Sequence, residues 1–205
     1  MNRTFFVFGL MCVLSLAFLG ACSEESTDAV SKASPQHSDK KVTLPPTGAD
    51  YEIVGIKEGL AGYMIKYDDK MYRGGQMTTQ EGLDYVKSLG VKTIVTITPT
   101  DVERKYVAEA KIKLVEVPFV KTDGPSKEIL DTFLEAVKTS DGPVYVHCHG
   151  GTHRAAILAA VYRMSVQGWD YDRTVIEYGT LGGDLKGDYG MLTRIRQYAP
   201  AATNN

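Results

Sequence analysis

The chain is poor in cysteine and has no excess of charge of one sign. Its 205 residues include three cysteines, Cys12, Cys22 and Cys148. These are too scattered to form the framework of a small disulfide-bonded domain. The 23 Lys and Arg residues nearly balance the 25 Asp and Glu residues. This balance excludes the broad basic surface with which proteins bind nucleic acid, so we expect no nucleic-acid partner and only a local anion site.

A hydrophobic run long enough to span a bilayer is also missing. The longest apolar run, from Phe5 to Leu19, has about 15 residues, fewer than the roughly 20 that a spanning helix needs. One basic residue, Arg3, precedes the run and small residues follow it, a pattern typical of a secretory signal peptide.

The residues around Cys22 resemble the lipobox of bacterial lipoproteins. Leu19-Gly20-Ala21 directly precedes this cysteine. The resemblance implies that residues 1–21 are a signal peptide and that Cys22 becomes the lipid-modified N-terminus. We therefore expect a protein anchored to a membrane of the bacterial cell envelope through its lipid. The alternative is an ordinary signal peptide with a chance cysteine near its cleavage site.

A polar segment separates this leader from the folded part of the chain. Residues 22–48 are rich in Ser, Thr, Lys, Asp and Pro and hold hardly any apolar cluster. Such a composition cannot bury enough surface to offset the entropy of ordering, so we expect a flexible tether. Residues 49–205 are the predicted domain.

Segments with strand and helix patterns alternate through the domain. This order predicts an α/β fold with a mainly parallel central sheet flanked by helices. The segment Arg73-Gly74-Gly75-Gln76 is interpreted as a turn whose glycines supply positive φ. The expected strands are 63–67, 70–73, 93–97, 112–117 and 144–146, and the expected helices are 78–89, 102–110, 126–139, 155–161, 170–178 and 188–198.

The densest cluster of reactive side chains follows the strand 144–146. The sequence there is His147-Cys148-His149-Gly150-Gly151-Thr152-His153-Arg154, and an apolar helix comes next. A glycine-containing loop between a strand and a helix N-terminus directs backbone N–H groups toward one point, where an anion binds. Arg154 adds a planar fork for two phosphate oxygens. The same field stabilises a thiolate, so Cys148 is expected to be a nucleophile.

This loop resembles the H-C-x-x-G-x-x-R signature of the cysteine-dependent protein tyrosine and dual-specificity phosphatases. The likeness extends roughly from Tyr72 to Thr180, in the manner of compact bacterial members. It implies hydrolysis of phosphomonoesters through a cysteinyl-phosphate, with Cys148 and Arg154 as catalytic residues, His147 as structural support, and no cofactor or metal. The implied phosphate-binding residues are His149, Gly150, Gly151, Thr152, His153 and Arg154.

The family also uses an aspartate as general acid on a loop before the cysteine. Asp123 lies between a predicted strand and a predicted helix, which is the appropriate context. Its alternative role is that of a turn or helix-capping residue. Asp101 is a weaker competitor that we expect at a helix start. Lys121 and Lys127 near Asp123 are interpreted as surface lysines, with the steering of anions as the alternative.

Other functions remain open at this stage. Ala155 stands where many relatives carry Ser or Thr, whose hydroxyl helps the thiolate to leave the phosphoenzyme, so turnover is expected to be slow after an initial burst. A phosphate-binding module that has lost turnover is therefore one alternative. A sulfurtransferase and a metal site made of Cys and His fit the loop less well. The expected substrate is a phosphorylated protein or a small phosphomonoester.

Overall fold

The structure, a computed structural model, describes residues 43–201, so the predictions for the signal peptide, for Cys22 and for residues 22–42 of the tether lie outside it. Within the described residues, no helix has the length and apolarity needed to cross a membrane. The strands are β1 (Glu52–Ile56), β2 (Tyr63–Lys66), β3 (Met71–Gly74), β4 (Thr93–Thr96), β5 (Lys113–Glu116) and β6 (Val144–His147). The helices are α1 (Gln80–Ser88), α2 (Asp101–Ala110), α3 (Lys127–Thr139), α4 (Arg154–Ser165), α5 (Tyr171–Thr180) and α6 (Tyr189–Ile195), and a 3₁₀ turn, Arg196–Tyr198, follows α6.

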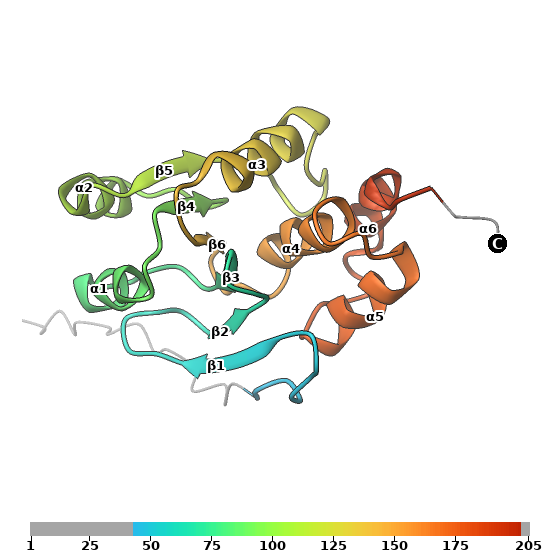
Figure 1. Cartoon of the computed structure of the whole chain (residues 1–205), viewed down its shortest axis with the longest axis horizontal. Helices are drawn as coiled ribbons and strands as arrows, with labels where there is room; N and C mark the ends of the chain where they lie inside the picture. Colours follow the sequence, from blue (N-terminus) through green and yellow to red (C-terminus); the bar gives the residue numbers. More distant parts are fainter. Residues whose placement is uncertain (1–42, 202–205) are drawn as a thin grey trace, which may run out of the picture. The chain divides into compact units, whose positions relative to one another are not determined.

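The six strands form one sheet in the order β1-β2-β3-β6-β4-β5. Strands β3, β6, β4 and β5 pair parallel with one another, whereas β2 pairs antiparallel with both β1 and β3. The prediction of a mainly parallel sheet flanked by helices is therefore confirmed (Figure 1). Strand β6, which leads into the reactive loop, lies in the interior of the sheet between β3 and β4.

Strand β1 is an element that the sequence analysis did not predict. It is an edge strand whose residues are exposed or only half buried. Its register with β2 shifts between Ile53 and Gly55, and Gly55 has a φ of 89°. A bulge and weak burial interrupt the alternation of apolar and polar residues on which strand prediction depends.

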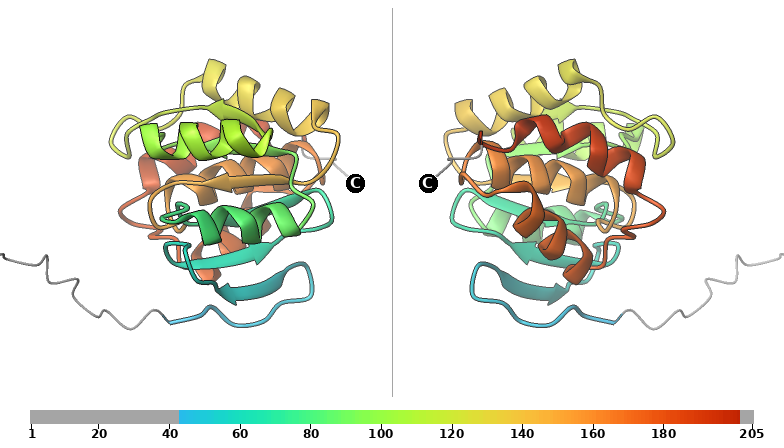
Figure 2. Two further views of the ribbon diagram at one scale, coloured as in Figure 1. Left: turned by 90° about the vertical axis from the view of Figure 1, so that its left-hand side faces the viewer. Right: turned by 90° about the vertical axis from the view of Figure 1, so that its right-hand side faces the viewer.

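Helices cover both faces of the sheet. Helices α1 and α2 pack on one face, where Leu83, Val86 and Val107 meet Ile94 and Tyr145. Helices α3, α4 and α6 pack on the other face, and the two views of Figure 2 show these two layers in turn. Because side chains alternate along a strand, neighbouring residues of β6 contact different layers.

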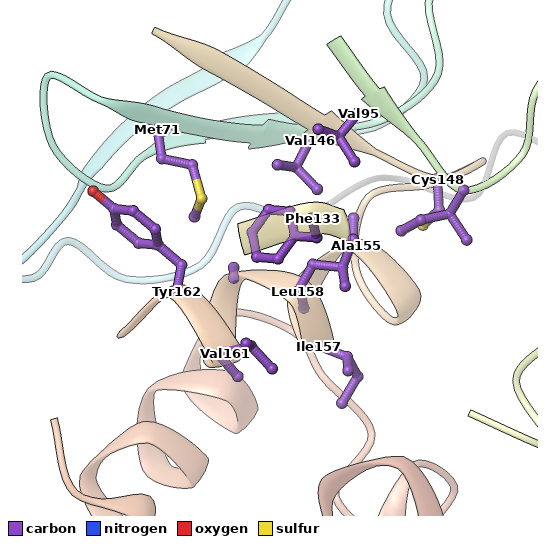
Figure 3. Close-up of a cluster of buried hydrophobic side chains, with 14 of the residues drawn as sticks. Met71, Val95, Phe133, Val146, Cys148, Ala155, Ile157, Leu158, Val161 and Tyr162 are labelled. Carbon is purple, nitrogen blue, oxygen red and sulfur yellow. The ribbon is translucent and has the colours of Figure 1, made fainter. Parts of the chain in front are cut away.

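Helix α4 is the centre of the larger core. Every residue from Ala155 to Met164 is buried. The apolar sequence of residues 155–161 predicts this burial, whereas the buried Arg163 was not predicted and pairs with Glu177. Figure 3 shows Cys148 at the edge of this cluster, near Val146 and Ala155. The core thus fixes both ends of the reactive loop, the strand before it and the helix after it.

Polar caps define where several helices begin. The side chains of Thr79, Thr100, Ser126 and Asp170 each accept a hydrogen bond from a backbone N–H in the first turn of their helix. These caps agree with the predicted helix starts to within two residues.

Candidate active site

The reactive loop runs from Cys148 to His153 and joins β6 to α4. His153 occupies the N-cap position of α4, and in the described part of the chain no side chain caps this helix. The first backbone N–H groups of a helix have no partner within the helix. Here they remain free to bind an anion, and the helix dipole adds to the attraction.

Glycines let this loop lie against the segment that follows β3. Gly151 has a φ of 78°, and a Cβ atom there would lie 2.5 Å from the carbonyl carbon of Gly74. A Cβ on Gly75 would lie 1.3 Å from the carbonyl oxygen of Ala61, and one on Gly74 would lie 2.3 Å from the hydroxyl of Tyr145. Neither Gly74 nor Gly75 is among the described residues with positive φ, so that part of the turn prediction was wrong. These two glycines are required by close approach instead.

Backbone hydrogen bonds hold the loop from two sides. The N–H of Gln76 donates to the carbonyl of His149, and the N–H of Ile97 donates to the carbonyl of His147, each at 3.0 Å. The Tyr145 hydroxyl donates to the carbonyl of Gly75 at 2.5 Å. The loop is therefore fixed before any ligand binds, which lowers the entropic cost of binding.

A cavity of about 490 Å³ opens above the loop. Cys148 contributes to its wall although only 3% of the residue is exposed. Arg154 also lines the cavity, and its Nη1 donates to the carbonyl of Phe119 at 3.4 Å. The lining residues are Val120, Lys121, Cys148, His149, Gly150, Thr152, His153 and Arg154. Of the loop residues predicted from the signature to bind phosphate, all except Gly151 line this cavity.

Asp123, the predicted general acid, follows the lining residues Val120 and Lys121 in the chain, but it does not itself line the cavity. Asp123 is exposed, accepts a hydrogen bond from the Thr122 hydroxyl at 3.1 Å, and is not among the described residues that line the cavity. The N–H of Gly124 donates to the carbonyl of Val120 and closes a turn around Asp123. Asp101 is the first residue of α2 and pairs with Arg104, in agreement with its expected place at a helix start.

His147 contacts a buried carboxylate that the sequence analysis missed. Its Nε2 lies 2.5 Å from Oε1 of Glu103, and both side chains are almost completely excluded from solvent. The Thr96 hydroxyl donates to the other oxygen of Glu103 at 3.1 Å. The structure is consistent with the implied supporting role of His147 and adds Glu103 to it. Glu103 lies among other charged residues of α2, so no sequence signal distinguishes it.

A second buried carboxylate, that of Asp188, lies at the other end of the loop. Its Oδ2 is 2.6 Å from Nδ1 of His153 and accepts a hydrogen bond from the Tyr178 hydroxyl at 2.5 Å. Its Oδ1 lies 2.8 Å from Nζ of Lys121. Burial acts to raise the pKa of Asp188, but the hydrogen bonds from Lys121, Tyr178 and His153 outweigh it and hold that pKa below its usual value.

The sequence analysis placed Asp188 only at a helix start. The structure confirms that position and adds the contacts with His153 and Lys121, which lie at least 35 positions away in the chain. Lys121, interpreted as a surface lysine, lines the cavity. Among the described residues, no group of three or more His, Cys, Asp or Glu side chains is arranged to hold a metal ion.

The fold and the loop define a class of protein: an α/β domain with a cysteine and an arginine at the two ends of a glycine-containing loop, between a parallel strand and a buried helix. The family model described as a DSP-PTPase phosphatase fused to NAD+ kinase matches residues 56–184. The chain belongs to this phosphatase family.

Relatives with curated names agree with this assignment. The chain is 31% identical over 109 residues to the dual specificity protein phosphatase TpbA of Pseudomonas aeruginosa, which covers 52% of this chain and 49% of that protein. It is 29% identical over 104 residues to the tyrosine-protein phosphatase cdc-14 of Caenorhabditis elegans, covering 51% and 13%. The chain spans about half the length of the TpbA relatives that it matches.

Solved structures support the fold. The crystal structure of P. aeruginosa TpbA matches with a TM-score of 0.55 and 22% identity, covering 69% of this chain and 96% of that one. A putative phosphatase from Shewanella putrefaciens matches with a TM-score of 0.56 and 18% identity, covering 70% and 94%. At these identities the likeness is evidence for the fold alone.

Proposed function

We propose that this protein hydrolyses phosphomonoesters through a cysteinyl-phosphate intermediate, as a tyrosine or dual-specificity type of phosphatase. The observation that carries the proposal is the position of Cys148. Its side chain lies at the wall of a cavity that also receives Arg154 and faces the uncapped N-terminus of α4. A phosphate bound to those N–H groups and to the guanidinium has its phosphorus close to the sulfur.

The reaction takes two steps. The Cys148 thiolate attacks phosphorus, and the bond between phosphorus and the leaving oxygen breaks as Asp123 donates a proton to that oxygen. Water then attacks the thiophosphate while the Asp123 carboxylate takes up a proton from that water, the S–P bond breaks, and inorganic phosphate leaves with the thiolate restored. Ala155 offers no hydroxyl to assist this second step, so a burst followed by slow turnover is expected.

The substrate is a phosphorylated protein or a small phosphomonoester. The resemblance to TpbA and cdc-14, which are named as dual specificity and tyrosine phosphatases, supports the first of these. The lipobox-like sequence before Cys22 supports attachment of the protein to a membrane of the bacterial cell envelope. A Cys22→Ser variant is expected to move to the soluble fraction, and unchanged partitioning with the membrane would contradict the anchor.

The test of the function is hydrolysis of p-nitrophenyl phosphate by the unmodified chain and by a Cys148→Ser variant. We expect the variant to lose turnover completely while inorganic phosphate still binds, because serine lacks a thiolate but leaves the backbone N–H groups in place. An Arg154→Ala variant is expected to lose both. Binding without any turnover in the unmodified chain would instead identify a phosphate-binding module.

The role of Asp123 is tested with two leaving groups. An Asp123→Asn variant should lose about 10²- to 10⁴-fold in rate with an alkyl phosphate, whose leaving oxygen needs a proton, and much less with p-nitrophenyl phosphate. Equal losses with both substrates would remove Asp123 from the role of acid. Asp131, an exposed aspartate of α3 paired with Lys127, is the matched control position for asparagine substitution.

A further inference from the structure

The cavity of the candidate active site is basic beyond its phosphate loop. Lys121, His149, His153 and Arg154 line it, and none of the lining side chains in the described part of the chain is acidic. Lys121 belongs to the loop between β5 and α3 and comes from outside the phosphatase signature.

Asp188 fixes Lys121 and His153 beside each other. This carboxylate has no exposed side-chain surface, so a ligand in the cavity cannot reach it. Its two oxygens contact Lys121 Nζ at 2.8 Å and His153 Nδ1 at 2.6 Å, while the Tyr178 hydroxyl and the N–H of Asp184 also donate to it. The carboxylate is thus anchored from the protein side and contacts two basic groups that both line the cavity.

The two basic groups keep unused donors. A lysine ammonium has three N–H donors, of which the contact with Asp188 occupies one. Imidazole in contact through Nδ1 retains its Nε2 for another partner. The side chains of Lys121 and His153 are 42% and 40% exposed, so a ligand in the cavity can contact them.

We propose that Lys121 and His153, oriented by the buried Asp188, form a second anion-binding subsite beside the Cys148 loop. The favoured substrate then carries a second anionic group, a phosphate, next to the phosphate that is hydrolysed. Asp188 is a positioning residue, because it acts only through the two basic side chains. This inference rests on the proposed function for the first phosphate, and preorganised donors of this kind bind a second one at little entropic cost.

Binding of two small ions tests the subsite without turnover. We would titrate the full chain carrying Cys148→Ser with inorganic phosphate and with pyrophosphate by calorimetry. Pyrophosphate is expected to bind at least about tenfold more tightly, because charged hydrogen bonds of Lys121 and His153 reach only the larger ion. Adding Lys121→Met should reduce this preference about tenfold. Adding Lys138→Met, which removes the same charge from an exposed site on α3, should leave the preference unchanged.

The sign of the effect at Asp188 separates positioning from general attraction. An Asp188→Asn substitution removes a negative charge near the cavity, so simple attraction predicts tighter binding of both ions. The proposal predicts weaker binding of pyrophosphate, because Lys121 and His153 lose the group that orients them. In a chain that already carries Lys121→Met, Asp188→Asn should weaken pyrophosphate binding less than it does alone. A double-mutant cycle measures this non-additivity.

The possible results distinguish the two proposals. If neither ion binds, the phosphate loop does not act as proposed and both the function and the subsite are overturned. If phosphate binds and pyrophosphate binds no better, or if Lys121→Met and Lys138→Met have equal effects, only the subsite is overturned. Lys121 is largely on the surface, so its substitution tests the subsite even if Asp188→Asn fails to fold.

Discussion

A histidine at each end of the reactive loop contacts a buried carboxylate, but the two pairs lie in different surroundings. At the start of the loop, His147 and Glu103 are both excluded from solvent on the face covered by α2. At the end of the loop, Asp188 is buried but His153 is open to the cavity. Both groups of the first pair are closed off from solvent, whereas the histidine of the second pair is open to the cavity.

The difference indicates two separate tasks. A pair sealed in the protein cannot touch a substrate, so its effect on the site must pass through the backbone of the loop. At the open end, His153 lines the cavity, so the pair that it forms with Asp188 affects the basic groups that a ligand can contact. Substitutions at the closed end are therefore expected to affect stability most, whereas those at the open end should affect ligand preference.

The largest loss of stability is expected from Glu103→Ala. The substitution leaves the ring of His147 and the hydroxyl of Thr96 buried without their partner, which should cost about 3 kcal/mol of unfolding free energy. Urea unfolding measures this cost. Glu116→Ala, which breaks an exposed pair with Arg104, is the control and should cost far less. A loss as small as that of Glu116→Ala would show that the contacts of Glu103 with His147 and Thr96 do not stabilise the fold.

A smaller loss is expected from Tyr178→Phe at the open end. The phenol donates to Asp188 at 2.5 Å, and a hydrogen bond to a charged group contributes about 1.5 kcal/mol or more. Lys121 and His153 still hold Asp188 in the variant, so the effect should stay below that of Glu103→Ala. Urea unfolding of both variants under the same conditions gives the comparison, and a reversed order would contradict it.

The helices, the strands other than β1 and the reactive loop were predicted from the sequence, but the side chains that surround the loop were not. Strand β6 and helix α4 have clear apolar patterns, and the spacing of Cys148 and Arg154 is local, so both were accessible from the sequence. Glu103 and Asp188 lie far from the loop in the chain, and the tertiary fold brings them to it. No local sequence pattern indicates such contacts. The bulged edge strand β1 lacked the regular alternation of a buried strand.

A still smaller effect is expected from the titration of Asp188. Its pKa is lower in the folded state than its ordinary value, so its ionised form stabilises the fold above about pH 4, and this stability is lost as the pH falls through the folded pKa. The effect is limited because burial opposes the hydrogen bonds. Unfolding free energy measured from pH 6 to pH 2 should fall less steeply in Asp188→Asn than in the unmodified chain. Parallel curves would contradict this assignment.

The smallest effect is expected at His149 within the loop, which contacts no buried carboxylate among residues 43–201. Its Nδ1 lies 3.4 Å from Oε1 of Gln76, in an exposed contact at the limit of a hydrogen bond. Gln76→Ala should change unfolding free energy by about 0.5 kcal/mol or less, because water replaces the lost amide. The backbone N–H of Gln76, which holds the loop through the carbonyl of His149, is retained in the variant. A large loss on urea unfolding would mean that the middle of the loop also depends on a side-chain partner, and that the contrast between its two ends is incomplete.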